Sequence, residues 1–304
     1  MSKVAVKNFA QYPSGSESSH LPVETIPDIL GGKALRSVAQ SMRGGKSKGV
    51  GILAGIGGHV IKAGCGPLLI GLMRDGLLTG LAGNGSVLVH DFEIAYAGQT
   101  SEDVDAALPD GSFGVTEETG RYLNEAAQRA YKTGEGLGAT LGQMILDMNL
   151  PYAEYSVLAQ ARKLGVPFTC HVSIGCDVWH LHPTADGAAI GAASMTDFRT
   201  FCDLVAGLND GGVYLNIGSA VVMPEVFLKA VTVVRNLGYP LKDFTTANFD
   251  FIQHYRPLTN VVRRPVAGVG KGYAITGPHE ILLPLLCLLL KSGPDKIEAL
   301  LLSE

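Results

Sequence analysis

The sequence predicts a single α/β domain built on a mostly parallel sheet with helices on both faces. Short apolar strand patterns alternate with helical patterns along the chain, which is typical of parallel sheets covered on two sides. The 39 glycines are spread out rather than clustered, as suits many strand-to-helix turns. No internal repeat or linker-like segment follows residue 33. We therefore expect an N-terminal arm at 1–33 and one domain at 34–304.

The expected elements follow from hydrophobic periodicity and from turn residues. The expected strands are 49–54, 77–83, 166–170, 213–217, 244–251 and 273–275. The expected helices are 35–42, 59–75 with an interruption at 64–67, 86–97, 117–131, 137–148, 153–164, 195–207, 224–237, 280–291 and 295–302. The helix at 117–131 is the best defined, because Thr116 can cap it and Glu117 and Glu118 occupy its first turn.

Composition limits the classes of partner. The chain of 304 residues is 46% hydrophobic and only 17% charged, so we expect a filled core and buried subunit contacts, most simply in a homotetramer. The apolar segment 281–290 is a candidate for such contacts. The net charge of −4 offers no basic surface, so we expect no nucleic-acid partner.

The cysteines and the first residues indicate a soluble cytoplasmic protein. Five cysteines, an odd number without Cys-x-x-Cys spacing, are typical of reduced thiols. Residues 1–20 are polar and lack the apolar region of a signal peptide. The longest apolar run, 281–290, contains Pro284 and is too short to span a bilayer, so we expect no membrane partner.

The predicted ligand edge lies beyond the carboxyl ends of the strands, as in other open parallel sheets. Those ends carry the glycine turns at 55–58, 83–85 and 218–219. Behind the turn at 83–85 come His90, Asp91 and Glu93. The two acids would serve a ribose hydroxyl or a cationic amine, or would only stabilise the start of their own helix.

The loop after Cys170 has the highest density of polar side chains, with three imidazoles and two carboxylates between His171 and Asp186. Asp177, His180 and His182 have donor types that could hold a transition metal. Alternatively these side chains bind backbone groups or an organic ligand. In that case Asp177 would pair with a cationic amine, and His180 or His182 would move a proton.

Lys271 lies in a glycine-flanked segment, Gly268-Val269-Gly270-Lys271-Gly272. Such a lysine would form a Schiff base if it were buried among apolar groups, and it would be an ordinary exposed loop residue otherwise. The sequence contains no complete G-x-G-x-x-G, no P-loop and no G-x-S-x-G elbow between a strand and a helix, which argues against ordinary dinucleotide dehydrogenases, NTPases and serine hydrolases.

Seven segments in this order resemble the deoxyhypusine synthase family, in particular its bacterial deoxyhypusine synthase-like branch. They are GGHVIKAG (57–64), GNGSVLVHDFE (83–93), GQTSEDVDAAL (98–108), FGVTEETGRYLNEA (113–126), GCDVWHLHPTADGAAIG (175–191), YLNIGSAVVMPEVFLKA (214–230) and GYAITGPHEILLPLL (272–286). The resemblance implies a Rossmann-like NAD-binding sheet and a homotetramer. It also implies a transferase that removes hydride from a polyamine or other small amine and passes the imine to a lysine and then to an acceptor amine.

Carried over by position, the resemblance implies roles for individual residues. It implies a cofactor site at Gly57, Gly58, Asn84, Gly85, Asp91, Thr246, Ala247 and Asp250. It implies that Asp177 contacts the amine substrate and that Lys271 is the catalytic lysine. From their own chemistry, Asp177, His180 and His182 are further candidates for catalysis, and His171 and Glu225 for substrate contacts. The chain departs from the family where Gly57-Gly58-His59 replaces Thr-Ser-Asn and where Val269 replaces a tryptophan.

Three functions follow as hypotheses. The first is an NAD-dependent enzyme on a small amine, polyamine or amino acid, by aminoalkyl transfer or by oxidative deamination. The second is a metal-dependent lyase or hydrolase that uses the 171–186 loop. The third is a non-catalytic small-molecule binding protein.

Overall fold

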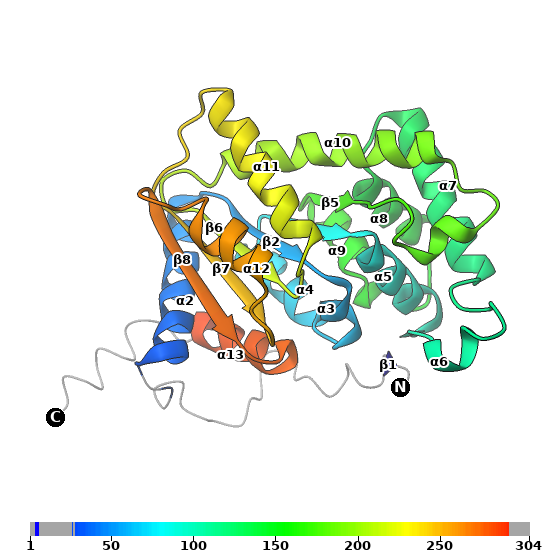
Figure 1. Cartoon of the computed structure of the whole chain (residues 1–304), viewed down its shortest axis with the longest axis horizontal. Helices are drawn as coiled ribbons and strands as arrows, with labels where there is room; N and C mark the ends of the chain where they lie inside the picture. Colours follow the sequence, from blue (N-terminus) through cyan, green and yellow to red (C-terminus); the bar gives the residue numbers. More distant parts are fainter. Residues whose placement is uncertain (1–3, 6–25, 27, 292–304) are drawn as a thin grey trace.

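The sheet has six parallel strands, as the sequence predicts (Figure 1). The computed structural model describes residues 4–5, 26 and 28–291. Across the sheet the strands lie in the order β5-β3-β2-β6-β7-β8. Their bounds are β2 Ile52–Ile56, β3 Gly80–Asn84, β5 Phe168–His171, β6 Val213–Ile217, β7 Phe244–Asp250 and β8 Gly270–Thr276. Every pairing among these six strands is parallel.

The strand order reverses direction between β2 and β6. From β2 the chain builds outward through β3 to β5, then returns to place β6 against the free edge of β2 and continues outward through β7 to β8. The register pairs Gly55 with Asn216 and Ile56 with Ile217. Because the chain leaves β2 and β6 toward opposite halves of the sheet, their carboxyl ends mark a reversal point. The crevice outside such a point is the usual ligand position in open α/β sheets.

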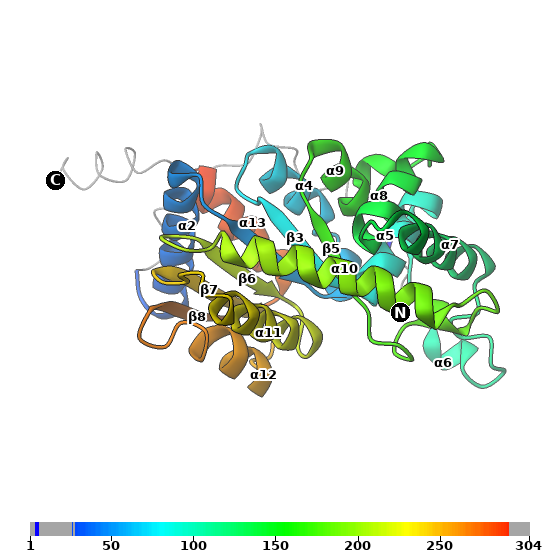
Figure 2. The ribbon, with the colours of Figure 1, turned by 90° about the horizontal axis from the view of Figure 1, so that it is seen from above.

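The two faces of the sheet bury separate hydrophobic clusters. Alternate residues of β2 divide between them, with Ile52, Ala54 and Ile56 in one cluster and Leu53 in the other. Helices α10 (Gly187–Ala206) and α11 (Val222–Asn236) cover one face, and α2 (Leu30–Lys48), α4 (Gly66–Arg74) and α13 (His279–Lys291) cover the other (Figure 2). Coverage on both faces explains why every residue of β2, β6 and β7 is buried.

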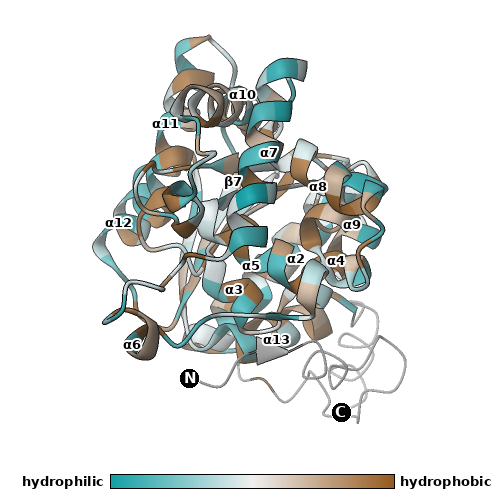
Figure 3. Cartoon of the chain, turned by 90° about the vertical axis from the view of Figure 1, so that its right-hand side faces the viewer, coloured by the Kyte–Doolittle hydropathy of each residue, from teal (hydrophilic) through white to brown (hydrophobic). Residues whose placement is uncertain are grey.

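The long connection from β3 to β5 forms a group of helices beside the sheet. It contains α5 (Gly85–Ala97), α7 (Glu117–Thr133), α8 (Leu137–Asp147) and α9 (Val157–Leu164). Helix α7 alternates hydrophilic and hydrophobic residues along its length (Figure 3) and buries Leu123, Ala126 and Ala130.

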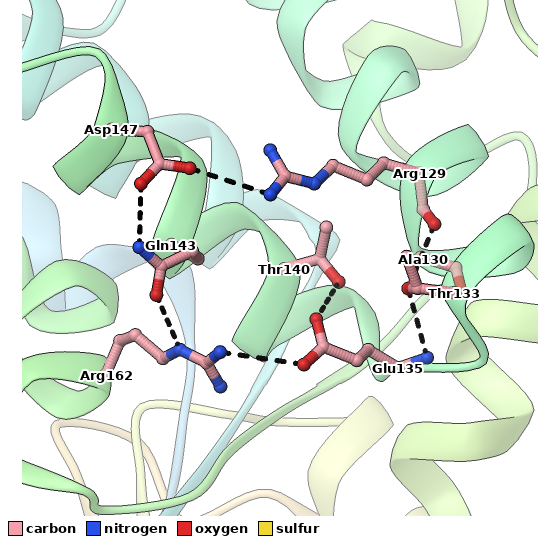
Figure 4. A network of polar contacts seen from close by, with 8 residues as sticks. All are labelled: Arg129, Ala130, Thr133, Glu135, Thr140, Gln143, Asp147 and Arg162. Atoms are coloured by element: carbon pink, nitrogen blue, oxygen red, sulfur yellow. Dashed lines mark hydrogen bonds and ion pairs between the residues drawn. The ribbon is translucent and has the colours of Figure 1, made fainter.

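A polar network ties the outer ends of these helices together (Figure 4). Arg129 pairs with Asp147 at 3.6 Å, Gln143 donates to Asp147 at 2.8 Å, and Arg162 bridges Gln143 and Glu135. These groups are exposed, so each pair stabilises the fold by at most about 1 kcal/mol. Their role is to hold α7, α8 and α9 in register rather than to bind a ligand.

Several boundaries differ from the sequence prediction. The helix predicted at 35–42 is longer at both ends, because α2 begins at Leu30 and continues to Lys48. It ends at Gly49, which adopts a left-handed conformation (φ 68°). Gly45 is tolerated in the helix because it packs closely on Ile52 and on the Gly211 backbone. Strand β3 begins three residues later than predicted, and α10 begins eight residues earlier. The expected helix 295–302 and most of the expected arm 1–33 lie outside the described residues.

The remaining described elements are short. They are β1 (Val4–Ala5), which pairs antiparallel with β4 (Gln99–Thr100), α3 (Gly58–Lys62), α6 (Val104–Ala107), η2 (Ala153–Tyr155), η3 (Val178–Leu181), α12 (Tyr255–Pro257) and η4 (Leu258–Arg263). Within the part of the chain that the structure describes, none of the helices has the length and apolarity needed to cross a bilayer.

The reversal point depends on a close approach between two turns. The Gly57 N–H donates to the Ile217 carbonyl at 2.9 Å, and a Cβ on Gly57 would overlap the Gly218 carbonyl oxygen. Gly218 itself has φ 64°, a conformation that side chains disfavour. Only glycine at 57 lets β2 and β6 end side by side at this distance.

We predict that Gly57→Ala destabilises the protein by about 1–3 kcal/mol, because the turns would have to separate to admit a methyl group. Gly71→Ala in α4 is the matched control, since a Cβ there meets nothing within 4 Å and alanine favours a helix. Chemical denaturation should show the control at or above the parent in stability. Equal stability of the two variants would contradict the close approach.

Candidate functional site

The carboxyl edge of the sheet brings together residues from loops that are far apart in the sequence. Gly57 and Gly58 follow β2, Asn84 and Gly85 follow β3, and Asp177 follows β5. Asp250 ends β7 on the other side of the reversal point. Of the residues predicted from sequence, these six lie at the predicted ligand edge.

A cavity of about 210 Å³ opens beside the ends of β3 and β5. One face of α5 forms its floor, with Ser86, Val89, His90 and Glu93 at helical spacing. The other lining residues are Lys62, Ser101, Glu102, Val104, Phe113, Cys176, Asp177 and Val178. The wall therefore combines charged groups with apolar side chains, as small-molecule sites commonly do.

Asp177 enters this cavity by packing on the start of α5. A Cβ on Gly85 would overlap the Asp177 carboxylate, so glycine at 85 is what allows the acid to lie there. Among the described residues, none forms a hydrogen bond or an ion pair with the Asp177 side chain. Burial raises the pKa of Asp177 to about 6. The carboxylate is therefore charged at neutral pH and lacks a counter-charge.

Lys62, on α3, provides the opposite charge in the same cavity. It is half-buried, and within the described chain its ammonium group has no hydrogen-bond or ion-pair partner. The pKa of neighbouring His90 falls to about 4, first because of burial and then because of electrostatic interactions with Lys62 and His59. His90 is therefore neutral at physiological pH.

The two glutamates of the cavity are already satisfied by the protein. Glu93 accepts hydrogen bonds from the hydroxyl groups of Thr100 and Thr119, and burial raises the pKa of its carboxyl group. Glu102 accepts from the Gly114 N–H at 2.8 Å and from the Thr116 hydroxyl at 3.0 Å. These acids hold the wall in shape, whereas Lys62 and Asp177 remain available to a ligand.

The reversal point contains a second polar cluster. His279, at the start of α13, is 1% exposed, and its Nε2 atom has no hydrogen-bond partner. Nε2 faces Gly218, where a Cβ would overlap it. The rings of His59 and Phe251 lie 5.7 and 6.2 Å from the His279 ring and cover it from solvent. Burial lowers the pKa of His279, against the opposing effect of Asp250.

Asparagine side chains continue this polar cluster across β6 and β7. Asn216 donates to the Asn248 side chain at 2.7 Å and to the Ser219 carbonyl at 2.9 Å, while its own Oδ1 has no partner. Asn248 donates in turn to Gln253. Two buried polar atoms without partners, His279 Nε2 and Asn216 Oδ1, therefore lie near the reversal point, and His279 is the one of these two residues that lies outside the sheet.

Asp91 is corrected by the structure. Its side chain is fully buried and accepts hydrogen bonds from the Ser156 hydroxyl and from the Val157 and Leu158 N–H groups. It therefore caps α9 instead of facing the crevice. Burial raises its pKa to about 6, against the three hydrogen bonds that lower it.

Thr246 and Ala247 are also corrected. Both lie in the middle of β7 and are 0% exposed, and the Thr246 hydroxyl donates to the Val261 carbonyl. Side chains in a covered strand interior cannot contact a ligand at the carboxyl edge. Only the end of that strand, at Asp250, reaches it.

The histidines of the 171–186 loop do not line the cavity. His171 is buried against Thr169 and Phe201, and burial lowers its pKa to about 3. His180 accepts from the Gly175 N–H through Nδ1, and burial lowers its pKa. His182 packs on Gly120 and pairs with Glu117 at 3.1 Å.

These three histidines contact different parts of the protein, and Asp177 lies apart from them in the cavity. Among the described residues, no group of three or more His, Cys, Asp or Glu side chains could hold a metal ion. The alternative metal site at Asp177, His180 and His182 is not assembled, because the loop spreads the three donors apart.

Glu225 and Lys271 lie away from the cavity. Glu225, in the first turn of α11, pairs with Lys229 and Arg256 and accepts from Asn260. Lys271 is the second residue of β8, not a loop residue, and it is exposed at the amino edge of the sheet. There it lines a separate cavity of about 500 Å³ with Lys48 and Asp243. The Lys271 ammonium group thus lies at the opposite edge from the crevice.

Sequence reasoning missed Lys62, His59 and His279 as site residues. His59 and Lys62 follow directly after Gly57-Gly58, so the glycine turn could have indicated them. His279 could not be found this way, because only the packing of α13 against the ends of β6 and β7 brings it to the crevice.

Comparisons with known proteins find the fold but no family. No family model matches the sequence, and no curated protein matches it. The complex of AgrE with ornithine and NAD+ is similar in structure, with a TM-score of 0.56 and 17% identity over 93% of this chain and 34% of that one. ArgZ, an arginine dihydrolase from the ornithine-ammonia cycle in cyanobacteria, has a TM-score of 0.51 and 18% identity over 86% and 33%.

A conserved putative LOR/SDH protein from Methanococcus maripaludis S2 has a TM-score of 0.52 and 17% identity over 94% of this chain and 74% of its own. The chain spans about a third of the length of AgrE and ArgZ. A putative deoxyhypusine synthase from Entamoeba histolytica reaches a TM-score of 0.46 at 10% identity, which is too distant to show membership of that family. The similarities establish a shared Rossmann-like fold.

We predict that substitution by alanine destabilises the protein strongly at Asp91 and only slightly at Asp177. Asp91→Ala should lower the free energy of unfolding by about 3 kcal/mol, because it leaves buried donors at the start of α9 without an acceptor. Asp177→Ala should leave stability within about 1 kcal/mol, because that carboxylate has no partner to lose. Urea denaturation followed by circular dichroism measures both, and the reverse order would contradict this assignment.

Proposed function

We propose that this protein binds NAD across the crevice between β2 and β6 and uses it to oxidise a small amine or amino acid held in the adjacent cavity. The observation that carries this proposal is that the two places share a wall. A Cβ on Gly58 would lie 2.5 Å from Ser86 Oγ and 3.0 Å from the His90 ring, and both of these residues line the cavity. A cofactor at the glycine turn and a substrate in the cavity would therefore be neighbours.

The support for NAD is the strand order together with the chemistry of the crevice. A reversal between adjacent parallel strands is where dinucleotides bind in such sheets, and glycine turns there permit close approach of a pyrophosphate. The carboxyl edge that would contact the cofactor consists of Gly57, Gly58, Asn84, Gly85 and Asp250. His279 offers an unpaired polar atom beside Gly218. AgrE, which has the same fold, was determined with ornithine and NAD+.

When bound, NAD supplies a hydride acceptor. The residues of the chain would bind the substrate, accept its proton and exclude water. Asp177 would hold an ammonium group, which at neutral pH is the form of an aliphatic amine. Because its pKa is raised to about 6, Asp177 is also a better proton acceptor than an ordinary aspartate, and an ammonium group must lose a proton before its carbon can release hydride. The apolar side chains of Val89, Val104 and Phe113 would exclude water from the substrate's methylene groups.

The imine formed by oxidation could have two fates. A deoxyhypusine synthase-like transfer would pass the imine to a lysine and then to an acceptor amine, whereas oxidative deamination would release it to water. Lys271 lies at the opposite edge of the sheet, so within one chain it does not meet the substrate cavity. This geometry favours oxidation without transfer to Lys271.

We predict that the parent protein binds NAD and that His279→Leu lowers the affinity at least tenfold without lowering the melting temperature. Leucine fills the same space and removes a buried polar atom that has no protein partner, so the fold should tolerate it. His279→Gln, which keeps a hydrogen-bonding group near the Nε2 position, should retain most of the affinity. Titration calorimetry measures all three.

The control is His254→Ala, since His254 is exposed and lies four residues after the end of β7. Absence of heat for the parent protein at millimolar NAD would refute cofactor binding. Equal affinity of the parent and the leucine variant would instead refute the role of His279 alone.

We also propose a homo-oligomer, with a tetramer as the expected state. Exposed apolar side chains surround the crevice, and exposed groups of this kind commonly mark subunit contacts. They are Val221, Phe251, Ile252, Tyr255 and Ile281. Light scattering should give a mass near four times the 31.9 kDa of one chain, and a mass near 31.9 kDa at micromolar concentration would refute it.

A further inference from the structure

We infer that the cavity selects an amino acid, a molecule with both a carboxylate and an ammonium group, and that Lys62 and Asp177 recognise these two groups. Diamines and polyamines would then be poor ligands. The inference rests on the proposed function only in that it assigns the substrate to this cavity.

The first step of the argument is that the cavity holds two opposite charges without partners. Lys62 and Asp177 both line it, and no ion pair joins them to each other or to another described residue. A partly buried charge without a counter-charge is costly, and it is compensated when a ligand of the opposite sign binds. One unpaired cation and one unpaired anion call for a ligand that carries both signs.

The second step is that the two glutamates and the imidazole of the wall already have partners in the protein. Glu93 and Glu102 each accept two hydrogen bonds from the protein. His90 contacts the Thr100 hydroxyl at 2.7 Å and is neutral. The selectivity of this site therefore depends on Lys62 and Asp177 and not on Glu93 and Glu102.

The third step concerns the diamine alternative. A diamine would place a second cation in a cavity of only about 210 Å³ that already contains the Lys62 ammonium group. Like charges at short range in a partly desolvated site repel strongly. A carboxylate on the same carbon skeleton turns that repulsion into attraction, so Lys62 acts as the residue that separates amino acids from their decarboxylated amines.

Cys176 provides a readout that needs neither NAD nor turnover. It lines the cavity and is exposed, whereas Cys65, Cys170 and Cys202 are buried and Cys287 is half-buried. A ligand in the cavity should slow alkylation of Cys176 by N-ethylmaleimide. Peptide mass spectrometry reports the rate at this one thiol.

The experiment compares four L-amino acids with the amines that lack only the carboxylate: ornithine with putrescine, lysine with cadaverine, arginine with agmatine, and norvaline with butylamine. In the parent protein we expect at least one amino acid to protect Cys176 at a concentration at least tenfold below that of its amine. In Lys62→Met, the ratio of the two protecting concentrations, amine to amino acid, should fall close to one, mainly because the amino acid binds more weakly. Asp177→Asn should weaken the binding of both the amino acid and its amine, because both carry the ammonium group.

Lys271→Met is the matched control, because it removes an exposed lysine at the opposite edge of the sheet. Its ratio should equal that of the parent. The inference is overturned if no amino acid protects better than its amine, or if Lys62→Met leaves the ratio unchanged. NAD titration of the same preparations separates the two proposals: selectivity without NAD binding would refute the proposed function alone, and NAD binding without selectivity would refute this inference alone.

Discussion

The close contact between the turns after β2 and β6 is the constraint on which the rest of the structure depends. A Cβ on Gly57 would overlap the Gly218 carbonyl oxygen, and a Cβ on Gly218 would overlap His279 Nε2. Hydrogen bonds tie each turn to the neighbouring strand. This contact fixes where the two halves of the sheet meet. It thereby sets the position of α3, which carries Lys62, and of α13, which carries His279. The candidate cofactor crevice and the charged cavity both follow from it.

Buried acids in this protein take two different roles, and the number of donors around each one decides which. Asp91 and Asp197 each accept hydrogen bonds from two or more backbone N–H groups. Asp91 connects α5 to the start of α9, and Asp197 connects α10 to the start of α8 and to β5. Asp177 packs against the start of α5, and no donor from the described residues reaches its carboxylate. The same chemical group is structural in the first case and available for a ligand in the second.

The two edges of the sheet have separate chemistry. The carboxyl edge combines glycine turns, unpaired polar atoms and the cavity with Lys62 and Asp177, whereas the amino edge holds the larger cavity with Lys48 and Lys271. A covalent relay through Lys271 would have to cross the full length of the strands within one chain. Direct oxidation of a bound amine or amino acid needs no such crossing, and so it is the simpler use of this architecture.

The sequence by itself determined the parallel α/β class, most helices, all six strands of the sheet within a few residues and the glycine turns of the ligand edge, because these depend on local periodicity and on residue type. It could not determine which polar side chains reach that edge. Asp91, Thr246 and the loop histidines have the right chemistry but turn into protein contacts, while Lys62 and His279 are brought to the site by helix packing. Tertiary structure decided these roles, because a hydrogen bond or ion pair depends on the distance between elements that the order of residues does not specify.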